Sequence, residues 1–160
     1  MKKIFIFYLV LFSITASGQD SLQQAKIKSL QGKIAAFSVF AKKDSLFLIC
    51  FWSISSDESI AELNSINASL EHWQSMISFR FMAVSVDEGK AANMLRPVYN
   101  QNGWTFEAYS DIYGDLRKAL HSNNLPQSLI IYKNEIIYEQ SGRTEGTENY
   151  LIQKLLSMKH

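Results

Sequence analysis

One short stretch carries the side chains that could act as nucleophiles: the thiol of Cys50 and the hydroxyls of Ser55, Ser56 and Ser59. A cysteine attacks as the thiolate, and a cysteine in apolar surroundings has a raised pKa and usually serves as packing. A serine hydroxyl needs a strong base beside it, and no histidine lies nearby in the sequence. The residue types therefore favour helix capping by Ser55 and Ser56 over catalysis.

The sequence contains none of the common motifs for nucleotide binding, serine hydrolysis or metal binding. There is no GxGxxG, no P-loop and no GxSxG nucleophile elbow. Three scattered histidines and one cysteine give no metal-ligand spacing, so we expect neither a metal nor a cofactor. No basic stripe is present, which makes nucleic acid a poor candidate partner. Asp87 and Glu88, and the acidic residues at 145–148, are interpreted as solvated loop charges.

A strand and a helix position the serine-rich stretch. Residues 45–50 form a continuous apolar run rich in β-forming residues, which is typical of a strand buried on both faces. From 57 to 76, apolar residues recur every three or four positions and predict a helix with one buried stripe. Ser55, followed three residues on by Glu58, is a capping-box pattern at its start. Residues 78–86 predict a second buried strand, so the three elements form a right-handed βαβ unit.

The rest of the chain predicts further strands and short helices around this unit. Pro97 is expected to break or kink the helical pattern in which it lies. In order, the expected elements are a hairpin over 25–36, a helix over 90–95, a loop over 100–103, a strand at the sheet edge over 104–109, a short helix over 116–120, strands over 127–132 and 135–140, and a closing helix over 147–158.

The N-terminus predicts export. Lys2 and Lys3 precede an apolar run that ends in the small residues Ala16, Ser17 and Gly18, which is the pattern of a secretory signal peptide over residues 1–18. The run is shorter than the roughly 20 residues needed to span a bilayer, so we expect no membrane association after cleavage. No cysteine stands directly after the cleavage site, which argues against a lipoprotein. We expect residues 19–160 to form one periplasmic domain.

The composition of the expected mature chain agrees with a protein that depends on its core. Of the 16 Lys and Arg residues, two lie in the signal segment, which leaves 14 against 15 Asp and Glu. A single cysteine cannot form an internal disulfide, so stability must come from buried apolar side chains.

Several segments resemble thioredoxin-like proteins of the TlpA type, a family of thiol-disulfide oxidoreductases. In that family FWAxWCxxC precedes an acidic, leucine-containing helix, and Phe51-Trp52 followed by Ile60-Ala61-Glu62-Leu63-Asn64 is similar to it. On this pattern the two redox cysteines fall on Ser56 and Ser59, and the tryptophan before them falls on Ser55. The resemblance covers roughly residues 46–158. The other similar segments are Val86-Asp87-Glu88, Arg96-Pro97-Val98, Asn102-Gly103-Trp104, Gly114-Asp115-Leu116 and Asn123-Asn124-Leu125-Pro126.

The resemblance implies a thioredoxin-like α/β fold, with a central mixed β-sheet flanked by helices and an N-terminal β-hairpin extension. It also implies that the Leu125–Pro126 bond is cis and faces the N-terminus of the helix, where the neighbouring backbone pairs with an extended substrate. The binding residues that it implies are Trp52, Ser55, Ser56, Leu125 and Pro126.

Three functions remain open at this point. The leading hypothesis is a redox-inactive, exported thioredoxin-like protein that binds a protein or an extended peptide. The second is a monothiol oxidoreductase or peroxidase that acts through Cys50 alone. The third is an accessory domain that keeps the fold and no site. The accessibility of Cys50 to a thiol reagent separates the second hypothesis from the other two.

Overall fold

Strand β3 (Leu46–Trp52) runs through the middle of the fold, and the other elements are arranged around it. The computed structural model describes residues 17–42 and 44–158. Its other strands are β1 (Lys26–Ser29), β2 (Ile34–Ala36), β4 (Arg80–Ser85), β5 (Glu107–Ser110), β6 (Gln127–Tyr132) and β7 (Glu135–Ser141). Its helices are α1 (Ser17–Gln24), the 3-10 turn η1 (Phe37–Val39), α2 (Asp57–Met76), α3 (Gly89–Ala92), α4 (Leu95–Gln101), α5 (Asp115–Ala119) and α6 (Thr147–Leu156).

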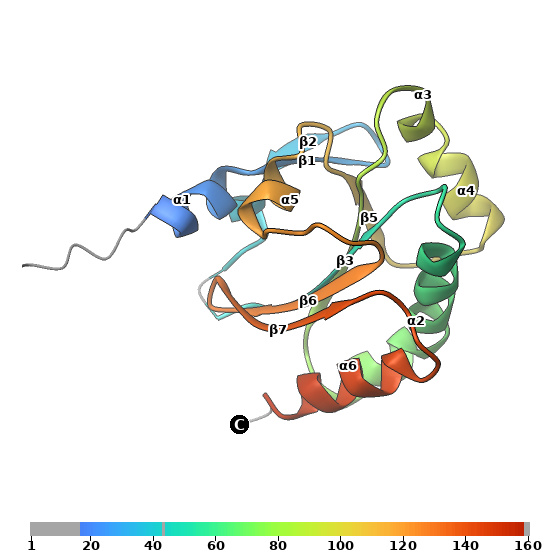
Figure 1. Cartoon of the computed structure of the whole chain (residues 1–160). Helices are drawn as coiled ribbons and strands as arrows, with labels where there is room; N and C mark the ends of the chain where they lie inside the picture. The colour runs from blue at the N-terminus through green and yellow to red at the C-terminus, as the bar shows by residue number, and fades with distance from the viewer. Residues whose placement is uncertain (1–16, 43, 159–160) are drawn as a thin grey trace, which may run out of the picture.

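The strands form one mixed sheet in the order β2-β1-β5-β4-β3-β6-β7. β3 is parallel to β4 and antiparallel to β6, and β4 is parallel to β5. Helices lie against both faces of this sheet (Figure 1). The predicted α/β class, the βαβ unit β3-α2-β4 and the N-terminal hairpin β1-β2 are confirmed.

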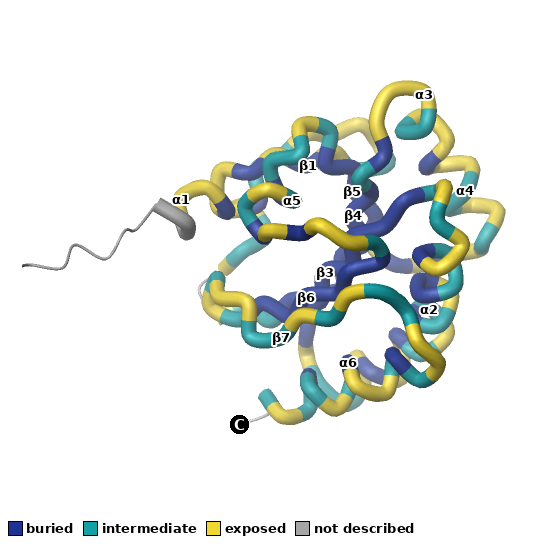
Figure 2. The backbone as a smooth tube through the Cα atoms, in the orientation of Figure 1, coloured by how far each residue is buried: buried dark blue, intermediate teal, exposed yellow. Residues whose placement is uncertain are grey.

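The alternation of side chains along β3 divides the core into two layers. Successive residues of a strand point to opposite faces of the sheet, and both faces of β3 are covered. This is why its sequence is a continuous apolar run and does not alternate with polar residues. Figure 2 shows the central strands buried and the outer sides of the helices exposed. The layer under α2 and α6 contains Leu48, Cys50 and Trp52, and the layer under α1 and α5 contains Phe47, Ile49 and Phe51.

Strand β5 does not lie at the edge of the sheet, so the prediction of an edge strand over 104–109 is wrong in position. β5 pairs with β4 on one side and with β1 on the other, where Lys28 lies opposite Ser110. The hairpin thus extends the sheet beyond β5, and β2 becomes the outer strand. Trp104 precedes the strand and packs in the core.

Pro97 lies inside a helix where a break or a kink was predicted. It occupies the first turn of α4, where a missing N–H group leaves no hydrogen bond unmade. As a consequence Asn100 and Gln101 are helical, and the predicted loop over 100–103 is reduced to the turn after α4.

The predicted signal peptide lies outside the described residues, apart from Ser17 and Gly18 in α1. Within the described ranges, none of the helices is long and apolar enough to cross a membrane.

Candidate functional site

The residues singled out by the sequence come together where β3 ends and β6 begins. Phe51 pairs with Gln127, so the residues just beyond them lie at the same edge of the sheet. We call this region the candidate edge and define it as residues 53–56 and 124–126. The Leu125–Pro126 peptide bond is cis, and the Pro126 carbonyl accepts a hydrogen bond from the Gly142 N–H at 2.8 Å.

Ser56, and not Ser55, caps helix α2. The Oγ atom of Ser56 accepts a hydrogen bond from the N–H of Ser59 at 3.1 Å. The hydroxyl of Ser55 instead shares a 2.9 Å hydrogen bond with the hydroxyl of Ser53. The predicted Ser55 capping box is therefore wrong. A capping box needs Glu or Gln three residues after the cap, and the third residue after Ser56 is Ser59.

The two serines of the CxxC-like spacing lie in different environments. Ser56 is half-buried and its oxygen is used for the cap. Ser59 is fully buried, and its Oγ atom has no hydrogen-bond partner among the described residues. Among the residues that the structure describes, neither hydroxyl donates a hydrogen bond to a base. The nearest buried carboxylate on this helix, Glu62, lies one turn further on and pairs with Arg143. Nucleophilic chemistry by these serines therefore has no support.

Asp87 holds the loop that carries the serines. One carboxylate oxygen accepts a hydrogen bond from the Ser53 hydroxyl at 2.7 Å, and the other accepts from the Ile54 N–H at 2.9 Å. The second oxygen also accepts from the Ser85 hydroxyl at 2.7 Å. Asp87 is 8% exposed, so its interpretation as a solvated loop charge is wrong. It ties the end of β4 to the loop that follows β3.

Trp52 is a core residue. Its side chain is 1% exposed and packs edge-on against Trp104, with 5.2 Å between the ring centroids. The indole is thus covered, and only the backbone of Trp52 borders the candidate edge. Leu125 is half-buried and Pro126 is buried, whereas Ser55 and Asn124 are exposed.

Cys50 lies inside the sheet. Its side chain is fully buried in the layer under α2, and burial raises the pKa of the thiol to about 12. The Sγ atom contacts the carbonyl oxygen of Phe51 at 3.8 Å. A thiol with this pKa and no solvent contact has almost no thiolate at neutral pH. The Cys50 hypothesis therefore gains no support from the geometry.

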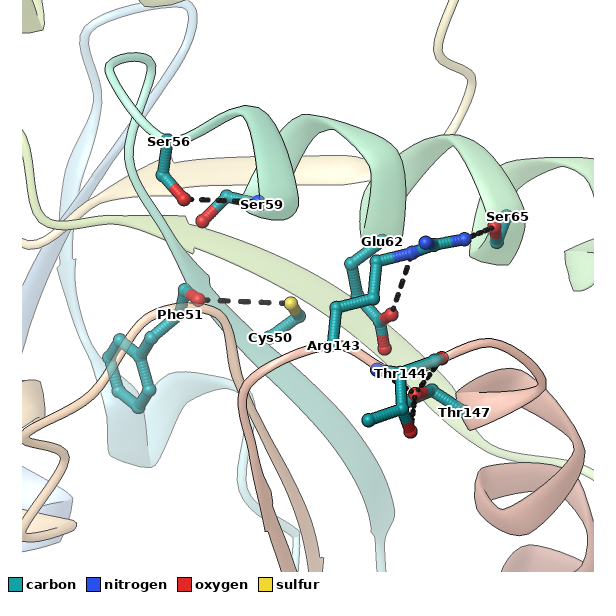
Figure 3. A network of polar contacts seen from close by, with 9 residues as sticks. All are labelled: Cys50, Phe51, Ser56, Ser59, Glu62, Ser65, Arg143, Thr144 and Thr147. Atoms are coloured by element: carbon teal, nitrogen blue, oxygen red, sulfur yellow. Dashed lines mark hydrogen bonds and ion pairs between the residues drawn. The ribbon is translucent and has the colours of Figure 1, made fainter.

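Glu62 is a buried carboxylate that the sequence did not reveal as unusual. It lies on the inner face of α2 with 1% of its side chain exposed, and Arg143 lies 3.6 Å away as an ion-pair partner (Figure 3). Burial raises the pKa of Glu62, the positive charge of Arg143 lowers it and the negative charge of Glu148 raises it, with a resulting value of about 7. Arg143 also donates a hydrogen bond to Ser65 at 3.1 Å, which ties the β7–α6 connection to α2.

Solved structures similar to the chain share one architecture. An uncharacterized thioredoxin-like protein from Porphyromonas gingivalis is 28% identical, and the match covers 88% of this chain and 94% of that one with a TM-score of 0.73. The chain has a thioredoxin-like fold. StoA from Bacillus subtilis (19% identity, 80% and 92% covered, TM-score 0.65) and peroxiredoxin Q from Xanthomonas campestris (14%, 87% and 94%, 0.71) share this fold. No protein-family model and no curated protein matches the chain.

Sequence reasoning missed the structural roles of two buried carboxylates of this thioredoxin-like fold, Asp87 and Glu62. Asp87 directly follows a predicted buried strand. A carboxylate at the end of such a strand can accept hydrogen bonds from a neighbouring serine-rich loop, and this position could have indicated that Asp87 is buried. Glu62 interrupts the apolar stripe of α2 between Ile60 and Leu63, but its burial depends on α6 packing across it. Among the described residues, no group of three His, Cys, Asp or Glu side chains could hold a metal ion.

Cys50 is expected to be unreactive in the native thioredoxin-like fold. At a given pH, the raised pKa lowers the thiolate fraction by about 1,000-fold relative to an ordinary cysteine, in addition to the steric block. Reaction with DTNB, followed by absorbance, should be at least about 100-fold slower in the native state than in concentrated guanidinium chloride. The variant Ser56→Cys is the matched control, because it adds one thiol at the half-buried cap position and should show one fast equivalent. Equal rates for Cys50 and for the added thiol would revive the monothiol hypothesis.

Proposed function

We propose that the protein is a redox-inactive, TlpA-type member of the thioredoxin-like proteins that binds an extended polypeptide at the candidate edge. The TlpA assignment is supported by the similar segments spread over residues 46–158. Binding there is by backbone pairing, and the partner is a protein or peptide segment without regular structure. The protein acts without a metal or a cofactor.

The observation that carries the proposal is the unpaired backbone next to β6. Among the described residues, nothing hydrogen-bonds to the backbone N–H or C=O groups of Asn124 and Leu125. Unpaired main-chain groups at the end of a strand are a template for an added strand, and such pairing depends on backbone shape more than on side chains. Asn124 is exposed and Leu125 half-buried, so the groups are open to a partner. Across the edge, Asp87 fixes the opposing loop through Ser53.

The absence of thiols at the edge supports binding without redox turnover. Serines stand at both positions that align with the redox cysteines, Ser56 and Ser59. The remaining thiol, that of Cys50, is fully buried. A bound polypeptide would therefore meet no group that could form a mixed disulfide, and it would be released unchanged.

Export to the periplasm is part of the proposal. It is supported by the charged, apolar and small-residue parts of segment 1–18. In this location the mature chain, from Gln19 onward, would meet exported polypeptides that are not yet folded. These provide the extended segments that strand addition requires.

An uncharged extended peptide is expected to bind at the candidate edge. The probe is acetyl-Ser-Thr-Val-Gln-Val-Thr-Ser-amide, titrated into the ¹⁵N-labelled protein while amide chemical shifts are recorded. We expect a dissociation constant on the order of 0.1–1 mM, with the largest shifts at Ser55, Asn124 and Leu125. The same peptide with N-methyl groups at alternate residues is the matched control, because it keeps the side chains and loses the backbone N–H donors at those residues. Shifts elsewhere, or equal binding of the methylated peptide, would leave only a fold with no retained site.

A further inference from the structure

A hollow of about 490 Å³ opens beside the candidate edge, on the side of α5. Its walls come from three segments: the turn after β4, helix α5 with the turn before it, and the loop that leads to β6. We call it the basic pocket and define it by Glu88, Arg117, Lys118, His121, Ser122 and Asn123, with the half-exposed ring of Tyr113 at its rim. Glu88 is far in the sequence from the other lining residues, which all lie within 113–123, and no motif in that stretch predicted the pocket.

Two cations of the basic pocket have no acidic partner. Within residues 17–42 and 44–158, no carboxylate lies within ion-pair distance of Arg117 or Lys118, although Glu88 lines the same hollow. The guanidinium of Arg117 donates to the backbone carbonyls of Ser122 at 2.9 Å and Asn123 at 3.5 Å. These contacts fix Arg117 and use two of its five N–H donors. The ammonium of Lys118 is exposed and keeps its three donors.

Ser122 forms the buried floor of the basic pocket. It is 2% exposed, and its hydroxyl has no hydrogen-bond partner among the described residues. A buried hydroxyl without a partner is unfavourable, so such groups usually bind a ligand or a water molecule. The free donors of Arg117 and Lys118, with the exposed His121 imidazole beside them, form a set that suits a carboxylate.

The basic pocket is continuous with the candidate edge on both sides. Glu88 directly follows Asp87, which holds Ser53 and Ile54. On the other side, Asn123 directly precedes Asn124, whose backbone is unpaired. A strand added at this backbone directs every second side chain to the face of the sheet that α5 covers (Figure 1). A long side chain at such a position would point toward Arg117 and Lys118.

We infer that the basic pocket binds an acidic side chain of the polypeptide held at the candidate edge, and that it selects partners with Asp or Glu at one position. The inference rests on the proposed function, because it needs the polypeptide to lie along the edge. It goes further, because it names a sequence feature of the partner. The recognition is a charge-assisted hydrogen bond between a carboxylate and the Arg117–Lys118 pair.

The test compares two peptides that differ by one group: the uncharged probe above and the same peptide with Glu in place of its central Gln. At low ionic strength we expect the Glu peptide to bind about 5- to 10-fold more tightly and to shift the Arg117 Nε–H and the Ser122 amide. The variant Lys118→Gln should reduce the preference to about 2-fold, and added salt should weaken it in the wild type. Lys154→Gln, the same change on α6, is the matched control and should keep the full preference.

Each outcome separates the two proposals. Equal affinity for the two peptides, with shifts retained at the candidate edge, overturns the basic pocket and leaves polypeptide binding in place. No shifts at the edge with either peptide overturn both. Inorganic phosphate that alone shifts Arg117 and Ser122 as strongly as the Glu peptide would make a free anion the ligand, which also overturns the inference.

Discussion

Raising the pH from about 5 to about 8 is expected to lower the free energy of unfolding of the wild-type protein by roughly 2.5 kcal/mol more than that of the Glu62→Gln variant. The reason is the pKa of Glu62, which is raised by burial from 4.5 to about 7. The native state therefore holds a proton between these two values that the unfolded chain has released. The stabilisation due to this proton is complete below pH 4.5 and is lost as the pH rises through about 7.

The charges around Glu62 explain why the ion pair does not reverse this sign. Arg143 lies beside Glu62 (Figure 3), 3.6 Å away, and attracts the ionised form. Glu148 repels that form, and the Glu62 side chain is only 1% exposed. The Cys50 thiol faces the same interior and stays protonated. One partner at 3.6 Å does not replace the water that the carboxylate has lost.

Denaturant titrations across this pH range measure the effect. Glutamine mimics the protonated carboxyl, so the two proteins should be similar in stability near pH 5 and differ most near pH 8, with the variant more stable. Glu71→Gln, an exposed position on the same helix, is the control and should follow the wild type. Other titrating groups, such as Asp111 and Glu107, contribute equally to both proteins and cancel in the difference. A constant stability difference between the two proteins across the range would show that Glu62 titrates normally.

The Asp87→Ala variant is expected to lose about 2–4 kcal/mol of stability and to release the loop at residues 53–56. The carboxylate of Asp87 accepts hydrogen bonds from Ser53, Ile54 and Ser85, and all three donors would lose a charged acceptor in a nearly water-free place. Hydrogen bonds to charged groups are stronger than those between neutral groups, and donors left unsatisfied after burial add to the loss.

Two measurements separate local release from general destabilisation. Hydrogen exchange at the Ile54 amide should become faster by more than the global stability loss accounts for, because this N–H donates directly to Asp87. Binding of the uncharged peptide should weaken in parallel. Glu88→Ala removes the same charge one residue away, at an exposed position, and should change stability by less than about 0.5 kcal/mol. Equal changes in stability and in Ile54 exchange for the two variants would show that Asp87 does not hold the loop at residues 53–56.

The sequence allowed the sheet and its central helix to be predicted because both have strong periodic signals. The run before Phe51 could only be a buried strand, and the stripe from Ile60 to Trp73 fixed the extent of α2. Errors arose where a choice depends on a partner distant in sequence. Trp104–Tyr109 gave no sign that β1 would pair beyond β5. The capping-box pattern pointed to Ser55, whereas its neighbour Ser56 is the cap.

The candidate site was only half predictable for the same reason. Ser55, Ser56, Leu125 and Pro126 were found through the resemblance, and the pairing of Phe51 with Gln127 brings them to one edge. Asp87, Glu62 and the cations of the basic pocket were missed, because their roles depend on burial and on neighbours from other segments. A charged residue in a sequence does not reveal whether the folded chain will cover it.

The short hairpin at the N-terminus limits the growth of the sheet. Strand β5 would otherwise present free amide and carbonyl groups to other molecules, and β1 occupies them through Lys28 and Ser29. The new outer strand, β2, has only three residues, and on the opposite side β7 carries Glu135 and Glu139 on exposed positions. Short and charged outer strands discourage the addition of a second chain. The hairpin thus terminates the sheet at that end and discourages open-ended polymerisation through β5, so that the proposed addition of a strand beside β6 would stop at one partner.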